Sequence, residues 1–303
     1  MLRIAISGAS GLIGAELARS LSAEGHSILP LVRRREQDAS EAVFWDPAKG
    51  RIDSESLNGI DVMIHLAASN LGDGRWTPAR KAEIVNSRVG GTSLLAKTLP
   101  ALARPPNVWL CASAVGFYGS REPEDIVDEA AGPGTGFLAE VCRVWEQAAA
   151  PAVAAGLRTM FMRFGVVLAP HGGALAKLLP VFKLGLGGPI GNGRQMMSWV
   201  ALDEIPSVVR HLIATEALAG PVNVVSPHPV PNREFARELG AALNRPAVLP
   251  APAFALRLAF GEMAEETVLA GQNVKCGKLL ESGYSFRWPD VGPALKAMLS
   301  ARS

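Results

Sequence analysis

The N-terminal stretch Arg3-Ile4-Ala5-Ile6-Ser7-Gly8-Ala9-Ser10-Gly11-Leu12-Ile13-Gly14 joins a strand-like apolar run to a helical pattern that begins at Ala15. Its glycines follow the spacing GxxGxxG. Gly8 permits a sharp turn, Gly11 lets the backbone approach a pyrophosphate, and Gly14 lets the following helix pack closely on the strand. The helix N-terminus adds N–H groups and the positive end of a dipole. The stretch therefore predicts a dinucleotide-binding loop formed by Gly8, Ser10, Gly11, Leu12, Ile13 and Gly14, with an ordinary strand-to-helix connection as the alternative.

The residues after the second predicted strand indicate which dinucleotide is bound. An NAD site usually places Asp or Glu there to bind the ribose 2′-hydroxyl. This chain instead reads Leu31-Val32-Arg33-Arg34-Arg35, and its first acid is Glu36. Because guanidinium groups bind a 2′-phosphate through charge-assisted hydrogen bonds, we expect NADP(H) in preference to NAD(H), held by Arg33 and Arg34. A solvated basic turn is the alternative.

Short apolar runs alternate with longer helical patterns through the first half of the chain. Strands that alternate with helices of this length form a parallel sheet covered on both faces. The sequence therefore predicts an α/β, doubly wound parallel-sheet Rossmann fold. Thr77 followed by Pro78 marks one helix start. The predicted strands are residues 3–7, 27–32, 42–45, 61–66, 108–112 and 158–163, and the predicted helices are residues 11–24, 78–99 and 137–155.

The pattern changes after Arg163. Residues 169–197 are rich in Gly and Pro, which is typical of a lid or lobe and not of a sheet strand. The chain then returns to the sheet, with a strand at 198–201, a helix at 203–215 capped by Asp203 and a strand at 221–225; a helix at 233–243 capped by Asn232 follows. We expect a nucleotide-binding domain at 1–168, completed by 198–225, and a smaller, mainly C-terminal substrate lobe at 169–197 and 226–303.

The composition excludes several classes of protein. Of the 303 residues, 49% are apolar and 19% are charged, so the chain is not disordered. The 30 basic and 28 acidic groups leave a net charge of +2, which does not favour nucleic acid as a partner. Arginines interrupt the longest apolar runs before they reach the ~20 residues of a membrane span. Cys111, Cys142 and Cys276 form no disulfide or metal pattern, and with a strand-like N-terminus instead of a signal peptide they predict a cytoplasmic protein. We also expect a monomer or homodimer.

Several further motifs resemble the extended short-chain dehydrogenase/reductase superfamily, of the NAD-dependent epimerase/dehydratase type. After the glycine loop, the motifs that carry this resemblance are Asp61-Val62-Met63-Ile64-His65-Leu66-Ala67-Ala68, Asn86-Ser87-Arg88-Val89-Gly90-Gly91-Thr92, Ala112-Ser113-Ala114-Val115-Gly116-Phe117-Tyr118-Gly119 and Arg163-Phe164-Gly165-Val166-Val167. The resemblance implies a cofactor site that includes His65, Leu66, Ala67, Ala68 and Arg163. Finer motifs such as Trp45-Asp46-Pro47 are similar to "epimerase family" proteins labelled cell-division-inhibitor-like nucleotide-sugar epimerases.

The chemistry of that superfamily depends on a Tyr–Lys pair that this chain lacks. In the family, hydride moves at nicotinamide C4 while the tyrosine handles the substrate proton, the lysine lowers the tyrosine pKa, and a Ser or Thr hydrogen-bonds the reacting oxygen. The positions of the pair hold Phe137 and Val141, or, one residue later, Leu138 and Cys142. The resemblance leaves Ser113 as the candidate catalytic residue, with a hydroxyl bonded to backbone at a strand end as the alternative.

Three further residues are candidates for contact with substrate: Arg75, Tyr118 and Arg194. Arg75 lies in the loop after a predicted strand, where ligands bind in such folds. Arg194 resembles the place where nucleotide-sugar enzymes hold phosphate. The alternatives are a solvated loop charge for each arginine, structural packing for Tyr118, and a buried structural histidine for His65. No metal site is predicted.

Two functions from different classes follow. The first is an NADP(H)-dependent oxidoreductase or epimerase that acts on a carbonyl or hydroxyl substrate, with nucleotide-linked sugars as one candidate class. It would use Ser113 with another acid or solvent in place of the Tyr–Lys pair. The second is a catalytically silent sensor or scaffold that binds NADP(H) and reports its state to a partner. The missing pair favours the second function, and the retained substrate lobe favours the first.

Overall fold

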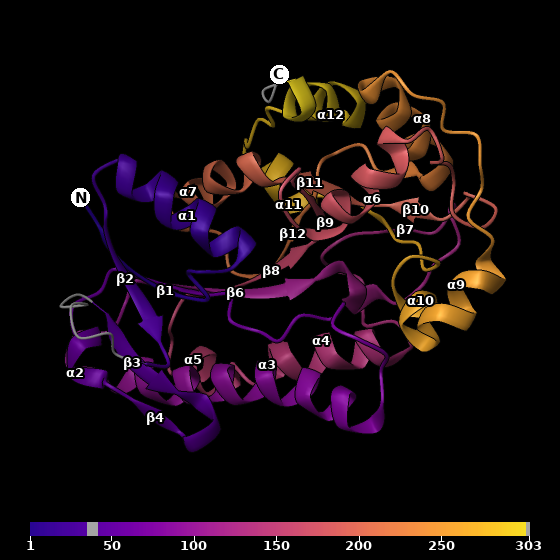
Figure 1. Ribbon diagram of the computed structural model, residues 1–303. Coiled ribbons are helices and arrows are strands. Elements are labelled where there is room, and N and C mark those ends of the chain that lie inside the picture. The colour runs from indigo at the N-terminus through magenta and orange to yellow at the C-terminus, as the bar shows by residue number, and fades with distance from the viewer. Residues whose placement is uncertain (35–41, 301–303) are drawn as a thin grey trace.

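The computed structural model describes residues 1–34 and 42–300. At its centre lies an eight-stranded sheet with the order β12-β8-β6-β5-β1-β2-β3-β4 (Figure 1). Neighbouring strands are parallel except for the pair of β3 and β4. This confirms the predicted α/β, Rossmann-type sheet. The strands are β1 (Arg3–Ser7), β2 (Ser27–Val32), β3 (Val43–Asp46), β4 (Arg51–Ile52), β5 (Val62–His65), β6 (Val108–Ala114), β8 (Thr159–Phe164) and β12 (Gly220–Val224).

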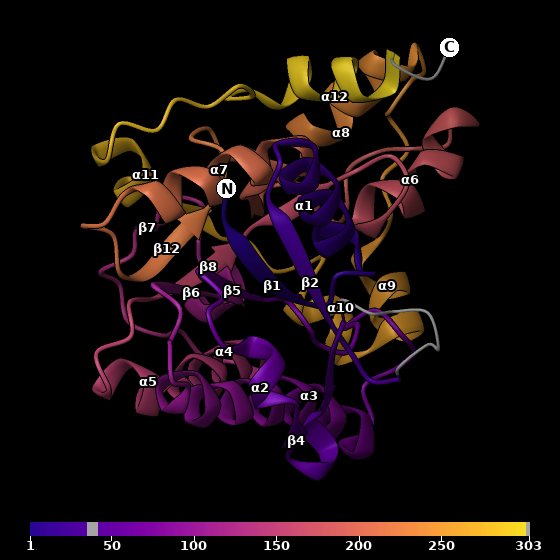
Figure 2. The same cartoon turned by 90° about the vertical axis from the view of Figure 1, so that its left-hand side faces the viewer.

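Helices cover both faces of this sheet, as Figures 1 and 2 show from two directions. One face carries α1 (Leu12–Ala23) and α7 (Ile205–Ala214), and the other carries α2 (Ser54–Leu57), α3 (Pro78–Thr98), α4 (Phe137–Gln147) and α5 (Ala150–Ala154). Successive residues of β1 supply both cores, because side chains alternate across a strand. Ile4 and Ile6 pack in the cluster that contains Leu17 of α1, while Ala5 packs in the cluster that contains Leu95 of α3.

Two predicted helix boundaries have different outcomes. The start at Thr77 is confirmed, since its hydroxyl accepts a hydrogen bond from the Arg80 N–H at 3.2 Å and α3 begins at Pro78. The single helix expected over residues 137–155 is wrong, because α4 ends at Gln147 and α5 begins at Ala150. Pro151 lies in the first turn of α5, where its missing N–H is tolerated, whereas the interior of one continuous helix would leave a carbonyl unpaired.

The predicted return to the main sheet at 198–201 is also wrong. Strand β11 (Trp199–Ala201) pairs with β9 (Val166–Leu168) in a separate two-stranded sheet. The chain leaves the main sheet at Gly165, whose N–H still bonds the Val224 carbonyl, and the next N–H, of Val166, bonds Ser198 instead. Only β12 rejoins the main sheet, beside β8.

The expected caps at Asp203 and Asn232 are corrected as well. Asp203 lies inside a short 3-10 turn (Leu202–Glu204), and Glu204 precedes α7 without a side-chain cap. Asn232 is the first residue of α8 (Asn232–Leu243), and its side-chain oxygen accepts from the Ile190 N–H at 2.7 Å. The Asn232 side chain therefore connects the segment near residue 190 to α8. It does not cap the N-terminus of α8.

The remaining elements lie mostly beyond the carboxyl end of the sheet (Figure 1). They are β7 (Ile126–Val127), α6 (Gly173–Lys183), β10 (Met196–Met197), β13 (Val230–Pro231), α9 (Ala253–Phe260), α10 (Glu262–Glu266), β14 (Asn273–Val274), α11 (Gly277–Glu281) and α12 (Val291–Ser300). A third apolar cluster joins α6, β11, α8 and α12. The predicted division at 1–168, 169–197, 198–225 and 226–303 stays a prediction. Within the described residues, no helix has both the length and the apolar character needed to cross a membrane.

Candidate functional site

The predicted phosphate-binding turn is a tight structure in which two glycines are required. Gly8 has φ of +74°, a backbone conformation that side chains disfavour. A Cβ on Gly14 would lie 2.1 Å from the Gly8 carbonyl oxygen, so only glycine lets α1 start this close to β1. The Gly11 N–H bonds the same carbonyl at 3.0 Å, and α1 begins at Leu12. The turn thus presents backbone at the N-terminus of a helix, as pyrophosphate binding requires.

Ser7 connects this turn to the predicted cofactor loop at Leu66, Ala67 and Ala68. Its hydroxyl oxygen accepts from the N–H groups of Leu66 at 3.2 Å and Ala67 at 3.3 Å. A Cβ on Gly8 would lie 3.0 Å from the Ala67 nitrogen, so the two loops touch. The structure therefore brings Gly8, Leu66 and Ala67 together at the carboxyl ends of β1 and β5. Ser7 had not been singled out in the sequence; its position just before the first glycine is the signal that could have found it.

His65 is a buried partner of Ser7 and does not reach the surface. The ring nitrogen Nδ1 lies 2.6 Å from the Ser7 hydroxyl. Because that oxygen already accepts two N–H groups, its own proton points at Nδ1, which leaves the imidazole proton on Nε2. Nε2 has no hydrogen-bond partner in the described structure, and the ring packs edge-on against Trp45. The ring is therefore enclosed by protein, and the contribution of His65 to the cofactor site stays a prediction.

The burial of His65 predicts a pH-dependent stability. Burial lowers its pKa to about 3, so between pH 6.5 and 3 the unfolded chain binds a proton that the folded chain does not. Stability is therefore lost as pH falls below 6.5, by about 2 kcal/mol at pH 5. Urea unfolding at pH 7 and pH 5 measures this loss. His65→Gln should reduce the difference in unfolding free energy between the two pH values, and the exposed control His171→Gln should keep it. The same difference in the wild-type protein and both variants would contradict the role of His65 in this pH dependence.

Arg33 and Arg34 follow the end of β2, and both are exposed. Strand β2 pairs with β1 in the register Ser7 with Leu31, so these arginines leave the sheet beside the glycine turn. That is where the ribose of a dinucleotide lies in such sheets. Arg35 and Glu36 lie outside the described residues. The preference for NADP(H) stays a prediction at this point.

Ser113, Arg163 and Tyr118 come together in a buried polar network centred on Glu146. The Ser113 hydroxyl donates to Glu146 Oε1 at 2.7 Å. Arg163 donates to both oxygens of Glu146, each at 2.9 Å, and to the Tyr118 hydroxyl at 2.9 Å. Tyr118 in turn donates to Asn223 Oδ1 at 2.7 Å. The guanidinium of Arg163 also lies over the ring of Phe117, 3.5 Å from its centroid.

Two of the predicted site residues, Tyr118 and Arg163, are buried within this network. Tyr118 has no exposed surface and Arg163 is 3% exposed, so the structure places both inside the core, and their contact with a ligand stays a prediction. Burial raises the pKa of Tyr118, although Arg163 opposes that effect. Ser113 is 3% exposed, and its hydroxyl proton is already bonded to a carboxylate. The neighbouring residue on β6, Ala114, points to the opposite face and carries no polar group.

The missing Tyr–Lys pair can now be placed on α4. A Cβ on Gly116 would lie 3.5 Å from Leu138 Cβ and 3.9 Å from Cys142 Sγ, so these two residues face the carboxyl end of β6. Phe137 turns away and packs against Trp76, with 5.1 Å between ring centroids. The register of Leu138 and Cys142 is therefore the one that faces β6. Burial raises the pKa of the Cys142 thiol to about 12, which leaves it protonated and a poor nucleophile.

The N-terminus of α4 is held by a side chain from the lobe. Glu266 of α10 accepts from the N–H groups of Phe137 at 3.2 Å and Leu138 at 3.1 Å. A carboxylate at this end of a helix satisfies free N–H groups and complements the dipole. Lys81 of α3 lies over the Phe137 ring, 4.6 Å from its centroid, and pairs with Glu262 of α10. The short helix α10 thus contacts the N-terminal turns of both α3 and α4 through these two carboxylates.

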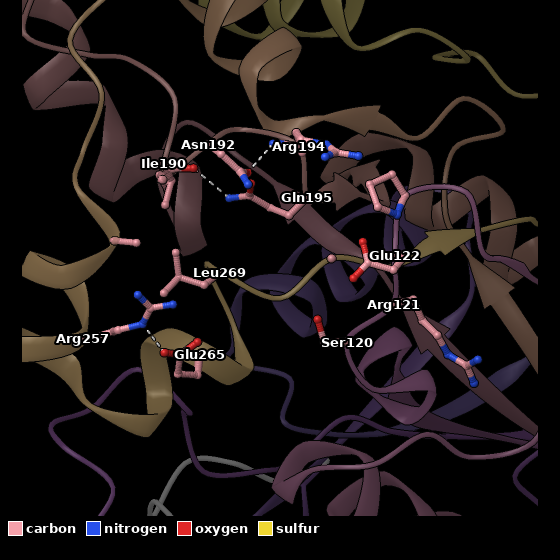
Figure 3. A pocket seen from close by; sticks show the side chains of 14 residues that line it. Ser120, Arg121, Glu122, Ile190, Asn192, Arg194, Gln195, Arg257, Glu265 and Leu269 are labelled. Carbon is pink, nitrogen blue, oxygen red and sulfur yellow. Dashed lines mark hydrogen bonds and ion pairs between the residues drawn. The ribbon is translucent and has the colours of Figure 1, made fainter.

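A polar pocket of 260 Å³ lies where the lobe meets the turn after β6 (Figure 3). Three arginines contribute to its wall: Arg121, Arg194 and Arg257. Arg257 pairs with Glu265, and Arg194 lies 3.7 Å from Glu124. Arg75, by contrast, lies against the turn at Gly261, where a Cβ would be 3.3 Å from its Nη2 atom. The structure therefore separates the predicted substrate residues, because Arg194 lines the pocket, Arg75 lies beside α10 and Tyr118 is in the core.

Glu146 and Glu266 were not predicted from the sequence. Glu146 lies four residues after Cys142, on the same face of α4, which is the one local signal that points to it. Glu266 acts on Phe137 and Leu138, which are 129 and 128 residues away in the sequence, and has no local signal. No cluster of three or more His, Cys, Asp or Glu suited to a metal ion occurs in the parts of the chain that the structure describes.

Comparison with known proteins adds to this geometry. Residues 4–225 match the model of the NAD dependent epimerase/dehydratase family, and residues 251–298 match a domain of unknown function, DUF1731. The chain is 40% identical over 292 residues to the epimerase family protein Mb2239 of Mycobacterium bovis, covering 96% of each protein. It is 32% identical to the human epimerase family protein SDR39U1, covering 99% of this chain and 100% of that protein. The crystal structure of human SDR39U1 (isoform 2) with NADPH superposes with a TM-score of 0.87 at 29% identity, over 99% of both chains.

Proposed function

Because the chain belongs to the NAD-dependent epimerase/dehydratase family, we propose that it is an NADP(H)-dependent oxidoreductase or epimerase that works without a Tyr–Lys pair. Its substrate would carry a carbonyl or hydroxyl group. The observation that carries this proposal is the arginine-lined pocket of 260 Å³ beyond the carboxyl end of β6. In a doubly wound sheet, that end is where a ligand meets a dinucleotide bound at the glycine turn.

Two observations support NADP(H) as the cofactor. The glycine turn keeps side chains away from the space in front of α1, and the exposed Arg33 and Arg34 follow β2 beside it. The human relative was crystallised with NADPH. In this proposal, Gly8, Gly11 and the N-terminus of α1 hold the pyrophosphate, and Arg33 and Arg34 hold the 2′-phosphate.

The pocket also suggests a class of substrate. Arg194, whose guanidinium lies 3.7 Å from Glu124, suits phosphate or carboxylate oxygens, and Glu122 and Gln195 can bind hydroxyl groups. The guanidinium groups of Arg121 and Arg257 are paired with Asp125 and Glu265 and would have to exchange these partners for a ligand. An anionic, hydroxyl-rich molecule of the nucleotide-sugar type fits this lining. Arg75 is not part of the lining. The cytoplasmic location and the monomer or homodimer state are part of the same proposal and rest on the sequence.

The chemical step would differ from that of relatives with the pair. NADP(H), when bound, supplies or accepts hydride at the nicotinamide. At Cys142 and Leu138 the chain offers no group that moves a proton at neutral pH. Ser113 stands closest to that role, since its hydroxyl is polarised by Glu146 at 2.7 Å and would have to turn from that carboxylate to reach a substrate oxygen. Solvent would then carry the proton.

The second candidate function is a catalytically silent NADP(H) sensor or scaffold. A specific observation favours it, because the hydroxyl groups of Ser113 and Tyr118 are both bonded within the protein. Such a chain would bind NADPH tightly and change its oligomeric state or its affinity for a partner when the cofactor binds. Sustained turnover of any substrate would contradict this function.

Oxidation of NADPH by a broad panel of carbonyl compounds tests the first proposal. We expect at least one compound to be reduced, and Ser113→Ala to lower kcat/KM by roughly 10- to 100-fold, the value of one charge-assisted hydrogen bond. Fluorescence titration should give an unchanged Kd for NADPH, because Ser113 lies outside the glycine turn. If neither protein oxidises NADPH above background although both bind it, the sensor function is favoured instead.

A further inference from the structure

Arg88 of α3 is a buried cation that the proposed mechanism does not use. Its side chain is 7% exposed. One guanidinium nitrogen, Nη1, donates to the carbonyl of Ile84 at 3.0 Å and to that of Ser69 at 3.3 Å. The flat guanidinium group lies 5.1 Å from the centroid of the Trp145 ring. Nε and Nη2 make no hydrogen bond with the residues that the structure describes.

The charge of Arg88 has no acidic partner in the described part of the chain. Burial lowers its pKa to about 10, and no nearby carboxylate compensates for that effect. The contrast with Arg163 is direct, because that equally buried arginine is paired with both oxygens of Glu146. A buried charge without a partner is costly, so it persists where a ligand or a reaction requires it.

The position of Arg88 indicates which ligand it meets. Ser69, which it contacts, follows the cofactor loop at Ala67 and Ala68 after β5. Trp145 of α4 lies on the guanidinium, and the Arg88 charge also lowers the thiol pKa of Cys142 on the same helix against the larger effect of burial. Arg88 thus stands between the carboxyl ends of β5 and β6, where the dinucleotide passes in this kind of sheet. Cys142 occupies the lysine position of the missing pair in the register that faces β6.

We propose that Arg88 takes the place of the missing lysine and that its Nε–H and Nη2–H groups donate hydrogen bonds to the hydroxyl oxygens of the nicotinamide ribose. This inference rests on the NADP(H) binding proposed above. In this arrangement the positive charge is carried by Arg88 of α3, whereas the lysine of the usual pair would lie on α4. The smaller Cys142 at the lysine position leaves room for the Arg88 guanidinium group. Arg88 is a cofactor-binding residue in this arrangement, and it positions the reactive ring.

Binding of two ligands to the full chain tests this role. NADPH contains the nicotinamide ribose, whereas adenosine 2′,5′-bisphosphate contains only the adenine half. Arg88→Met should raise the Kd of NADPH by roughly 10- to 100-fold and leave the Kd of adenosine 2′,5′-bisphosphate unchanged. Arg88→Lys, which keeps the charge without the planar fork, should give a smaller loss. Arg143→Met on the exposed face of α4 is the matched control and should change neither Kd.

The other outcomes each overturn the inference. An unchanged Kd of NADPH in Arg88→Met would show that the guanidinium does not touch the cofactor. Equal losses for both ligands, together with a lower Tm of the ligand-free protein, would assign Arg88 a structural role. In our proposal the ligand-free Tm does not fall, since an unpaired buried charge is removed. If the wild-type chain binds adenosine 2′,5′-bisphosphate, the proposal that it binds NADP(H) stands whatever the Arg88 variants do. If the wild-type chain binds neither ligand, both the NADP(H) proposal and the proposed role of Arg88 fail.

Discussion

Glu146→Gln is expected to lower the free energy of unfolding by about 3–5 kcal/mol, the cost of removing one partner from a buried ion pair. Glu146 and Arg163 are bonded through two contacts of 2.9 Å, and their side chains are 11% and 4% exposed. Glutamine preserves the volume and can still accept from Ser113, but it leaves the Arg163 charge uncompensated inside the core. Urea unfolding followed by circular dichroism measures the change.

The matched control lies on the same helix. Glu140 pairs with Arg143 on the exposed face of α4, so Glu140→Gln should destabilise the protein far less than Glu146→Gln does. A double variant, Glu146→Leu with Arg163→Leu, should recover part of the lost stability because it removes both charges together. If Glu146→Gln and Glu140→Gln were equally mild, the pair would be solvated and Arg163 would be free to meet a ligand.

Arg33→Asp is expected to raise the Kd of NADPH by more than about 100-fold while changing the Kd of NADH by no more than about threefold. The substitution removes a charge-assisted hydrogen bond to the 2′-phosphate and places a negative charge beside it. NADH has a hydroxyl at that position, which an aspartate binds well. Isothermal titration calorimetry with both cofactors gives the two constants directly.

Arg51→Asp is the control for the change in net charge. Arg51 is exposed on β4 at the edge of the same sheet, so the variant alters the overall charge equally without facing the glycine turn. Its Kd for NADPH should stay within about threefold of the wild-type value, since exposed charges beyond a Debye length are screened. Equal losses of NADPH and NADH in Arg33→Asp would mean that the arginine does not read the 2′-phosphate.

The fold could be predicted because its signals are local. Strand β1 alternates Ile4 and Ile6 with Ala5, and the two sets pack on opposite sides of the sheet. The fold predictions that were wrong concern segments whose pairing partner is set by contacts distant in the sequence. Residues 199–201 form a strand as predicted, but their partner is β9, because the chain had already left the main sheet at Gly165.

The candidate site divides in the same way. The glycine turn and the basic residues after β2 are read from neighbouring residues. The surroundings of Ser113, Tyr118 and Arg163 cannot be read in this way, because they depend on which distant residues the fold places against each side chain. Tyr118 bonds Asn223, which is 105 residues away, and Arg163 bonds Glu146 across 17 residues. Each side chain was a plausible site residue until its partner was known.

Two predictions needed no tertiary structure: a glycine turn of the dinucleotide-binding type near the N-terminus, and the presence of neither tyrosine nor lysine at the positions expected for the catalytic pair. Both depend on which side chains are present at fixed spacings, and a missing phenol or amine cannot be restored by folding. Only the folded chain decided that Arg163 is neutralised by Glu146 and that Arg88, equally buried, has no acidic partner among the described residues. A buried charge is paired only if packing of α3 and α4 on the sheet brings an opposite charge within a few ångströms of it. The sequence alone does not give that distance.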